Sequence, residues 1–123
     1  MMRAPALIAA AFAGTITVAA ADTYPVSGAW TYDNASGNGP AKVCGPRVMR
    51  FSGNVRYDTG TSAPEYKNQS IVKRGATTWY VIDDFYTLQI RGRMIYTLRL
   101  IDEDHIEIAL EKGGRRFLLR RCE

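Results

Sequence analysis

The residues best suited to acid–base or metal chemistry stand together near the C-terminal end of the chain. The run Asp102-Glu103-Asp104-His105 combines three carboxylates with the only histidine. Such a group could hold a cation or supply a general acid or base. The run lacks the alternating ligands of a calcium-binding loop, so we interpret it as a solvated hairpin turn.

A second carboxylate pair, Asp83-Asp84, follows an expected strand and is also interpreted as a turn. Neighbouring residues at the end of a strand point to opposite faces, so the two carboxylates would not act together. A hydrolytic triad would have to combine His105 with Ser52 or Ser62, and the sequence contains no Gly-x-Ser-x-Gly elbow. With two cysteines and one histidine, the chain cannot supply the four Cys and His ligands of a structural zinc site. We therefore expect a protein that is not an enzyme and uses no cofactor.

Basic side chains are frequent in the second half of the chain. If adjacent strands bring some of them together, they could form a positive patch for an anionic lipid head group, glycan or acidic protein. The alternative is a set of scattered solvated charges, partly neutralised by Glu107 and Glu111. The net charge of +4 is mild, and we expect no nucleic-acid partner. The candidate anion patch consists of Arg91, Arg93, Arg99, Lys112, Arg115 and Arg116.

The two cysteines, Cys44 and Cys122, are predicted to form a structural disulfide. A redox-active thiol is the alternative, but the sequence has no Cys-x-x-Cys motif. Such a bond would tie the end of the chain to its first third. It would thereby place the last strand near an early one.

The first 21 residues have the order of a secretory signal peptide: a basic residue, Arg3, then an Ala-rich apolar run and small residues up to Ala21. A membrane anchor is the alternative, but the apolar run is shorter than the roughly 20 residues that span a bilayer. We therefore expect an exported protein, periplasmic or secreted, that does not span the membrane. Residues 22–123 would form its single domain.

The remaining sequence is patterned for strands. Ile106, Ile108 and Leu110 alternate with polar residues, which is typical of a half-buried strand. Short runs with turn signals between them predict an antiparallel meander of about eight strands, either a small barrel or, alternatively, a β-sandwich. Exposed loops at residues 33–40 and 59–64 could present binding residues. The expected strands lie within residues 26–32, 43–55, 66–73, 77–82, 86–91, 94–101, 105–111 and 115–122.

The segment Ser27-Gly28-Ala29-Trp30 resembles the Gly-x-Trp motif of lipocalins and related calycin barrels. In that family the Trp closes one end of the barrel under an Arg or Lys of the final strand. The resemblance therefore implies a barrel closed by Gly28, Trp30 and either Arg120 or Arg121. Length and a single disulfide are similar to small exported bacterial inhibitors of metalloproteases, although their disulfide closes a short early loop.

Two functions follow as expectations. The first is a non-catalytic binding protein, such as a protease-inhibitor-like barrel whose loops contact a protein. The alternative is a lipocalin-like carrier of a small apolar or anionic ligand, because an eight-stranded barrel can be filled by side chains or hold one small ligand. In either case we expect a monomer. A cavity would favour the carrier, and a filled interior would favour the protein-binding barrel.

Overall fold

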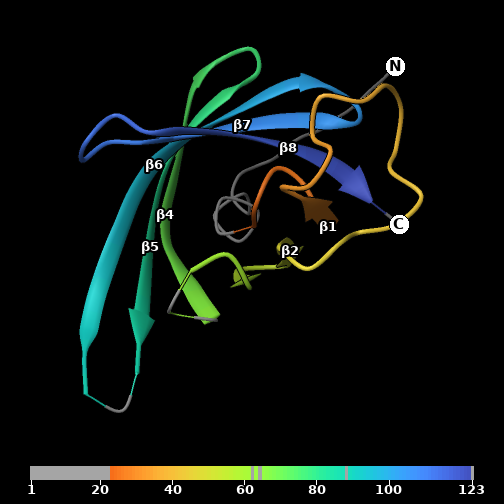
Figure 1. Cartoon of the computed structure of the whole chain (residues 1–123). Coiled ribbons are helices and arrows are strands. Elements are labelled where there is room, and N and C mark those ends of the chain that lie inside the picture. The colour runs from red at the N-terminus through yellow and green to blue at the C-terminus, as the bar shows by residue number, and fades with distance from the viewer. Residues whose placement is uncertain (1–22, 62, 64, 88, 123) are drawn as a thin grey trace, which may run out of the picture.

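The chain folds into a closed, eight-stranded antiparallel β-barrel (Figure 1). The computed structural model describes residues 23–61, 63, 65–87 and 89–122, so the predicted signal peptide lies outside the described residues. Each strand pairs with the next, and the first pairs with the last through Trp30 and Arg121. The strands are β1 (Gly28–Thr31), β2 (Val48–Ser52), β3 (Val55–Asp58), β4 (Glu65–Gly75), β5 (Thr78–Tyr86), β6 (Arg91–Asp102), β7 (His105–Leu110) and β8 (Arg116–Cys122).

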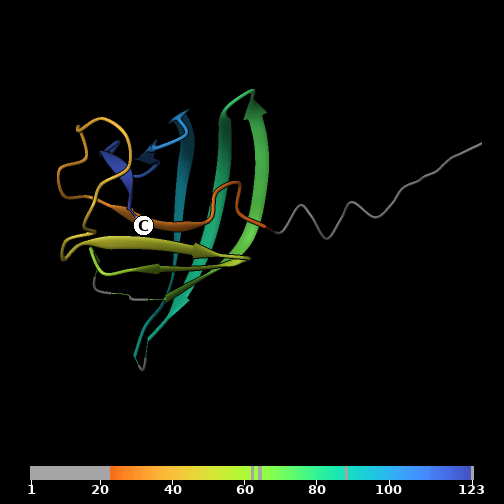
Figure 2. The same cartoon turned by 90° about the vertical axis from the view of Figure 1, so that its right-hand side faces the viewer.

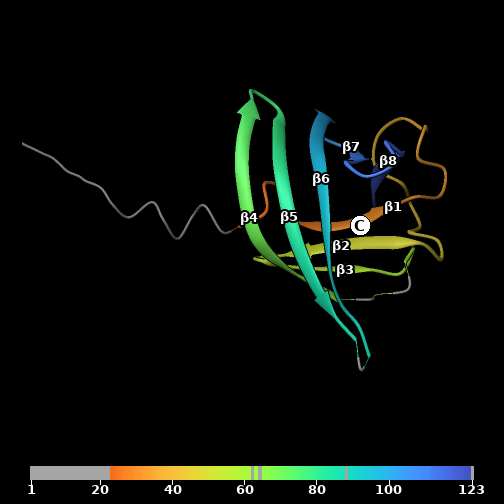
Figure 3. The ribbon, with the colours of Figure 1, turned by 90° about the vertical axis from the view of Figure 1, so that its left-hand side faces the viewer.

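The barrel confirms the all-β meander and excludes the sandwich, and it is compatible with the calycin-like architecture implied by the resemblance. Figures 2 and 3 show the short strands β1, β2 and β3 running across the long strands β4, β5 and β6. The hairpin that joins β5 to β6 projects beyond the rest of the barrel (Figure 3). Among the described residues, no helix is long and apolar enough to cross a membrane.

Alternation along the strands builds the core. In β7, Ile106 and Ile108 are buried while the residues between them are partly exposed, as the sequence pattern predicts. Trp30, Leu98 and Leu119 complete the centre of the same apolar cluster. Large apolar side chains therefore fill the part of the interior around this cluster.

Strand β5 differs from the prediction. Asp83 and Asp84 do not form a turn but lie within β5, Asp83 facing the interior and Asp84 the surface. The expected separate strand at residues 86–91 is therefore wrong, because β5 continues to Tyr86 and β6 begins at Arg91. Gly92 is part of β6, where a side chain would collide with the ring of Phe85. Gly92 therefore marks a site where the ring of Phe85 approaches the backbone closely, and it does not mark a turn.

The disulfide between Cys44 and Cys122 is present, as predicted. It joins the loop between β1 and β2 to the end of β8, across 78 positions of sequence. Ala41 forms a bridge to the backbone at Cys122 beside it. The long loop and the C-terminal strand consequently lie side by side (Figures 1 and 2).

Candidate ligand-binding site

One end of the barrel holds a partly enclosed cavity of about 280 Å³. It lies where β1 and β7 end and where β2, β6 and β8 begin. The volume is near the lower limit of roughly 300–1,000 Å³ that small-molecule pockets occupy. Its walls are largely apolar, with polar groups toward the interior and two arginines among the lining residues. The cavity is lined by Tyr32, Arg47, Met49, Asp58, Gly60, Thr61, Met94, Ile108, Leu110, Arg115 and Phe117.

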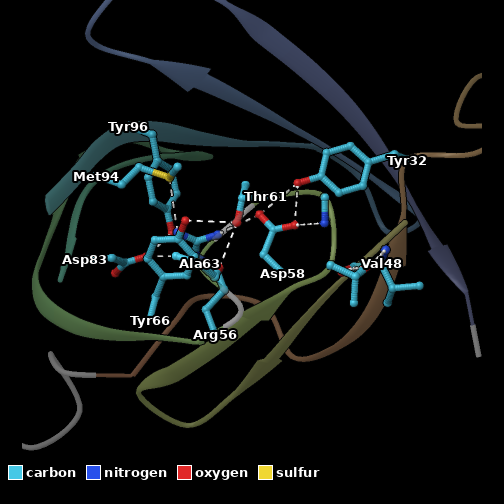
Figure 4. Close-up of polar contacts among 12 residues, drawn as sticks. Tyr32, Val48, Arg56, Asp58, Thr61, Ala63, Tyr66, Asp83, Met94 and Tyr96 are labelled. Carbon is cyan, nitrogen blue, oxygen red and sulfur yellow. Dashed lines mark hydrogen bonds and ion pairs between the residues drawn. The ribbon is translucent and has the colours of Figure 1, made fainter. Parts of the chain in front are cut away.

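A buried ion cluster lies beside this cavity (Figure 4). Alternation in β3 turns both Arg56 and Asp58 into the barrel, and β5, which is separated from β3 by β4, contributes Asp83. The Arg56 Nε–Asp83 Oδ2 distance is 2.8 Å, and the Arg56 Nη1–Asp58 Oδ2 distance is 3.2 Å. The three side chains are at most 1% exposed. Ions this deeply buried are rare unless they are paired, so each depends on the others.

Tyrosines complete the cluster. The hydroxyls of Tyr24 and Tyr96 each donate to Asp83 at 2.8 Å, and the Tyr32 hydroxyl donates to Asp58 at 3.0 Å. The Arg56 guanidinium lies 4.0 Å from the ring centroid of Tyr66, a cation–π distance. The carboxylates are thus surrounded by donors inside an otherwise apolar barrel.

The protonation of these groups is set by burial. Burial raises the pKa of the Tyr24 and Tyr96 hydroxyls above the usual range, and Asp83 raises it further. Burial and then the charge of Asp58 raise the pKa of Tyr32 in the same direction. All three hydroxyls therefore stay protonated and remain hydrogen-bond donors at neutral pH.

The loop between β1 and β2 (residues 32–47, the β1–β2 loop) reaches the cavity at both ends, through Tyr32 and Arg47. Its backbone is held by Arg120, whose guanidinium lies within hydrogen-bond distance of four of its carbonyl oxygens. A segment expected to be an open loop is therefore fastened to β8. The bonds run to Gly39 O at 2.7 Å, Asn38 O at 2.7 Å, Asn34 O at 3.1 Å and Pro40 O at 3.4 Å.

His105 fastens the same loop from β7. Its Nε2 lies 2.6 Å from Gly37 O, and its Nδ1 lies 2.8 Å from Asp102 Oδ1. Residues Glu103 and Asp104 do form the predicted hairpin turn between β6 and β7. Among the described residues, no group of three or more His, Cys, Asp or Glu side chains is arranged to hold a metal ion.

The residues proposed to close the barrel lie where β1 meets β8. Trp30 is fully buried, and the Arg121 guanidinium lies 4.5 Å from the centroid of its ring. Arg121 is therefore the arginine that covers the indole, while Arg120 binds the β1–β2 loop. Gly28 begins β1 with a φ of 85°, a backbone conformation that favours glycine.

The residues of the candidate anion patch fall into separate groups. Arg91 and Arg93 lie at the start of β6, where Arg93 pairs with Asp84 at 2.8 Å. Arg99 lies eight residues after Arg91 on the same strand, about 26 Å away at the usual rise per residue. It shares Glu107 with Arg116. Arg115 lines the cavity, and Lys112 lies in the turn between β7 and β8. The structure thus brings only Arg115 to the site.

Sequence reasoning missed the ion cluster. A local signal existed, because Arg56 and Asp58 alternate with Val55 and Tyr57 in one strand. Charged residues at alternate positions ordinarily face solvent, so the pattern alone places them outside. Their partner Asp83 lies 27 positions from Arg56 and is identified only by the barrel register.

No protein-family model matches the chain, and neither a curated protein nor a solved structure matches it.

Proposed function

We propose that this chain is an exported, non-catalytic binding protein that holds a small ligand in the cavity at the end of its barrel. The observation that carries the proposal is the partly enclosed space of about 280 Å³ with mostly apolar walls. Met49, Met94, Ile108, Leu110 and Phe117 supply those walls. An apolar pocket with a few convergent polar groups is the usual form of a small-molecule site.

The surroundings of the cavity support a preformed site. Its inner side lies against the buried pairs of Arg56 with Asp58 and Asp83, and the pair with Asp83 links β3 to β5. Its outer side is bounded by the β1–β2 loop, which Arg120 and the disulfide hold to β8. A preformed pocket pays little ordering cost when a ligand binds. The disulfide indicates an oxidising compartment, which fits export to the periplasm or beyond.

The test is to fill the cavity with a side chain. Leu110→Trp places an indole among the lining residues, whereas the matched control Leu118→Trp adds the same group to an exposed position on β8. Fluorescence titration with the neutral dye N-phenylnaphthylamine should give saturable binding to the native protein and to Leu118→Trp, and loss of binding to Leu110→Trp. No binding by the native protein, or equal binding by both variants, would contradict the proposal.

A second candidate is a protein-binding barrel of the protease-inhibitor type. It is favoured by the β1–β2 loop, whose fixed backbone presents Val43 at 76% exposure beside the disulfide. A rigid loop loses little entropy on binding a partner. Inhibition assays against a panel of metalloproteases and serine proteases test it, with Val43→Asp compared with Val72→Asp on β4. Inhibition that Val43→Asp abolishes and Val72→Asp spares would support this candidate, and absence of inhibition across the panel would count against it.

A further inference from the structure

The cavity has opposite polar character at its two ends. Its inner end presents the buried carboxylate of Asp58 and the hydroxyl of Tyr32, whose oxygens can accept hydrogen bonds, while Thr61 lies on the exposed side of the cavity. Its other polar lining groups are the guanidinium groups of Arg47 and Arg115, whose side chains are exposed to solvent. A ligand in this cavity therefore meets acceptors at one end and cations at the other.

The inner end has acceptor capacity to spare. Asp58 receives one hydrogen from Arg56 Nη1 at 3.2 Å, one from the Gly60 amide at 2.8 Å and one from Tyr32, whose hydroxyl lies 3.0 Å from both carboxylate oxygens. A carboxylate offers about four acceptor sites. One site thus remains at the carboxylate that lines the cavity.

The second carboxylate of the cluster is saturated. Asp83 accepts from Arg56, Tyr24, Tyr96 and the Asn68 amide, at distances between 2.8 and 3.1 Å. All of these partners are donors, which is the surrounding expected of an ionised carboxylate. One guanidinium therefore faces two carboxylates, and of the two only Asp58 lines the cavity.

At the outer end, Arg115 is the cation available to a ligand. Arg47 already pairs with Asp33 at 3.0 Å. Arg115 packs 5.1 Å from the ring of Phe117 and forms no ion pair with a carboxylate in the described part of the chain. Its guanidinium can therefore bind an anionic group at the mouth without giving up an existing partner.

This inference rests on the proposed function: we propose that the cavity binds a small amphiphilic ligand in one fixed orientation. The ligand has an apolar or aromatic body, a hydrogen-bond donor such as a hydroxyl at its inner end, and a carboxylate or similar anion at its outer end. The donor binds Asp58, and the anion binds Arg115. The reverse orientation is disfavoured because it would place an anion against the Asp58 carboxylate.

Three probes test both ends by isothermal titration calorimetry. Para-hydroxyphenylpropionate carries both polar groups, phenylpropionate lacks the inner donor, and para-ethylphenol lacks the outer anion. Hydrogen bonds to charged groups are stronger than neutral ones, so the first probe should bind the native protein about tenfold more tightly than either of the others. Equal affinities of the first two probes would overturn the inner assignment.

Two variants assign the effect to named side chains. Arg115→Gln should weaken both carboxylate probes and leave para-ethylphenol unchanged, whereas Arg116→Gln, which removes the same charge from a residue paired with Glu107, should alter none. Asp58→Asn should remove the preference for the hydroxyl. If Asp58→Asn does not fold, the three probes on the native protein still decide the inner end.

The outcomes separate this inference from the proposed function. Saturable dye binding that Leu110→Trp abolishes, combined with no preference among the three probes, would overturn the ligand polarity and leave a binding cavity. Unchanged affinity of both carboxylate probes for Arg115→Gln would overturn the outer assignment. Failure of the dye and of all three probes to bind would overturn both proposals.

Discussion

At the scale of single residues, the unusual feature is a charged cluster inside a small barrel. Desolvating ions is costly, and Arg56 offsets part of that cost through Asp58, Asp83 and the faces of Tyr66 and Tyr96. Burial disfavours the Arg56 cation, but its interactions with Tyr96 and Asp83 outweigh this effect and raise its pKa above the usual value. The cluster therefore depends on every partner being present.

Asp83 and Asp84 provide a matched pair for testing that dependence, since they are neighbours on opposite faces of β5. Asp83→Asn should destabilise the protein by about 3–5 kcal/mol, because Asp83 accepts from Arg56, Tyr24, Tyr96 and Asn68 and the new amide NH2 would face some of these buried donors. Asp84→Asn removes an exposed pair with Arg93 and should cost about 0–1 kcal/mol. Urea unfolding followed by circular dichroism measures both. Similar losses from the two substitutions would show that the interior pair is not a major source of stability.

The same two residues explain why prediction from sequence succeeded in part. Apolar alternation predicts β7, because its inward residues are hydrophobic, and the turn signal at Lys112-Gly113-Gly114 predicts the start of β8. Adjacent aspartates normally indicate a turn, so β5 was predicted too short. Whether Asp83 is buried depends on the pairing of strands that are far apart in the sequence. No local pattern shows that Asp83 pairs with Arg56.

The cavity could not be predicted from the sequence for a related reason. Its lining residues come from most strands of the barrel, and only the closed register places Tyr32 beside Phe117, with ring centroids 6.0 Å apart. A contact between Trp30 and an arginine of the final strand could be predicted, because the Gly-x-Trp resemblance implies it. Only the structure shows that Arg121, and not Arg120, covers the Trp30 ring.

At the scale of elements, the β1–β2 loop is the segment whose conformation depends on a few polar contacts. His105 contacts Gly37 O through Nε2 and Asp102 through Nδ1, so both ring nitrogens face acceptors. Only the protonated ring can donate a hydrogen bond to both of them. The hydrogen bond to Asp102 raises the pKa of His105, and that to Gly37 raises it further. Asp104 and the cross-strand residue Arg120 are the other charged groups facing it.

The raised pKa gives the pH dependence a definite sign. The contribution of His105 to holding the loop is complete below the pKa of an unfolded histidine, about 6.5. It is lost as pH rises through the higher pKa of the folded state. Hydrogen exchange, corrected for the intrinsic effect of pH, should show protection of the Gly37 and Ala41 amides falling over that interval.

His105→Gln is the control for this prediction, because glutamine can still donate to Gly37 O but does not titrate. Protection of the loop in that variant should no longer change across the same pH interval. NMR titration of the single histidine measures its pKa directly. A folded pKa at or below about 6.5 would contradict the proposed role of Asp102 and Gly37.

At the scale of the whole molecule, closure of the barrel and the disulfide act at the same place. β1 pairs with β8, Ala41 bridges to Cys122, and the disulfide joins Cys44 to Cys122. The first and last parts of the chain are thus connected by hydrogen bonds and by a covalent bond. The hydrogen bonds define the closed barrel, and the disulfide restricts the unfolded chain.

Removing the disulfide should therefore lower stability without opening the barrel. The bond spans 78 positions, and in the chain-entropy model a loop of that length restricts the unfolded state by about 4 kcal/mol. The double substitution Cys44→Ala with Cys122→Ala should lower the free energy of unfolding by an amount approaching that value, seen as a lower urea midpoint, while the strand content in circular dichroism stays unchanged. Loss of strand signal in the absence of urea would instead mean that the β1–β8 pairing cannot hold alone. An unchanged midpoint would mean that the unfolded chain is already compact enough to keep its ends close.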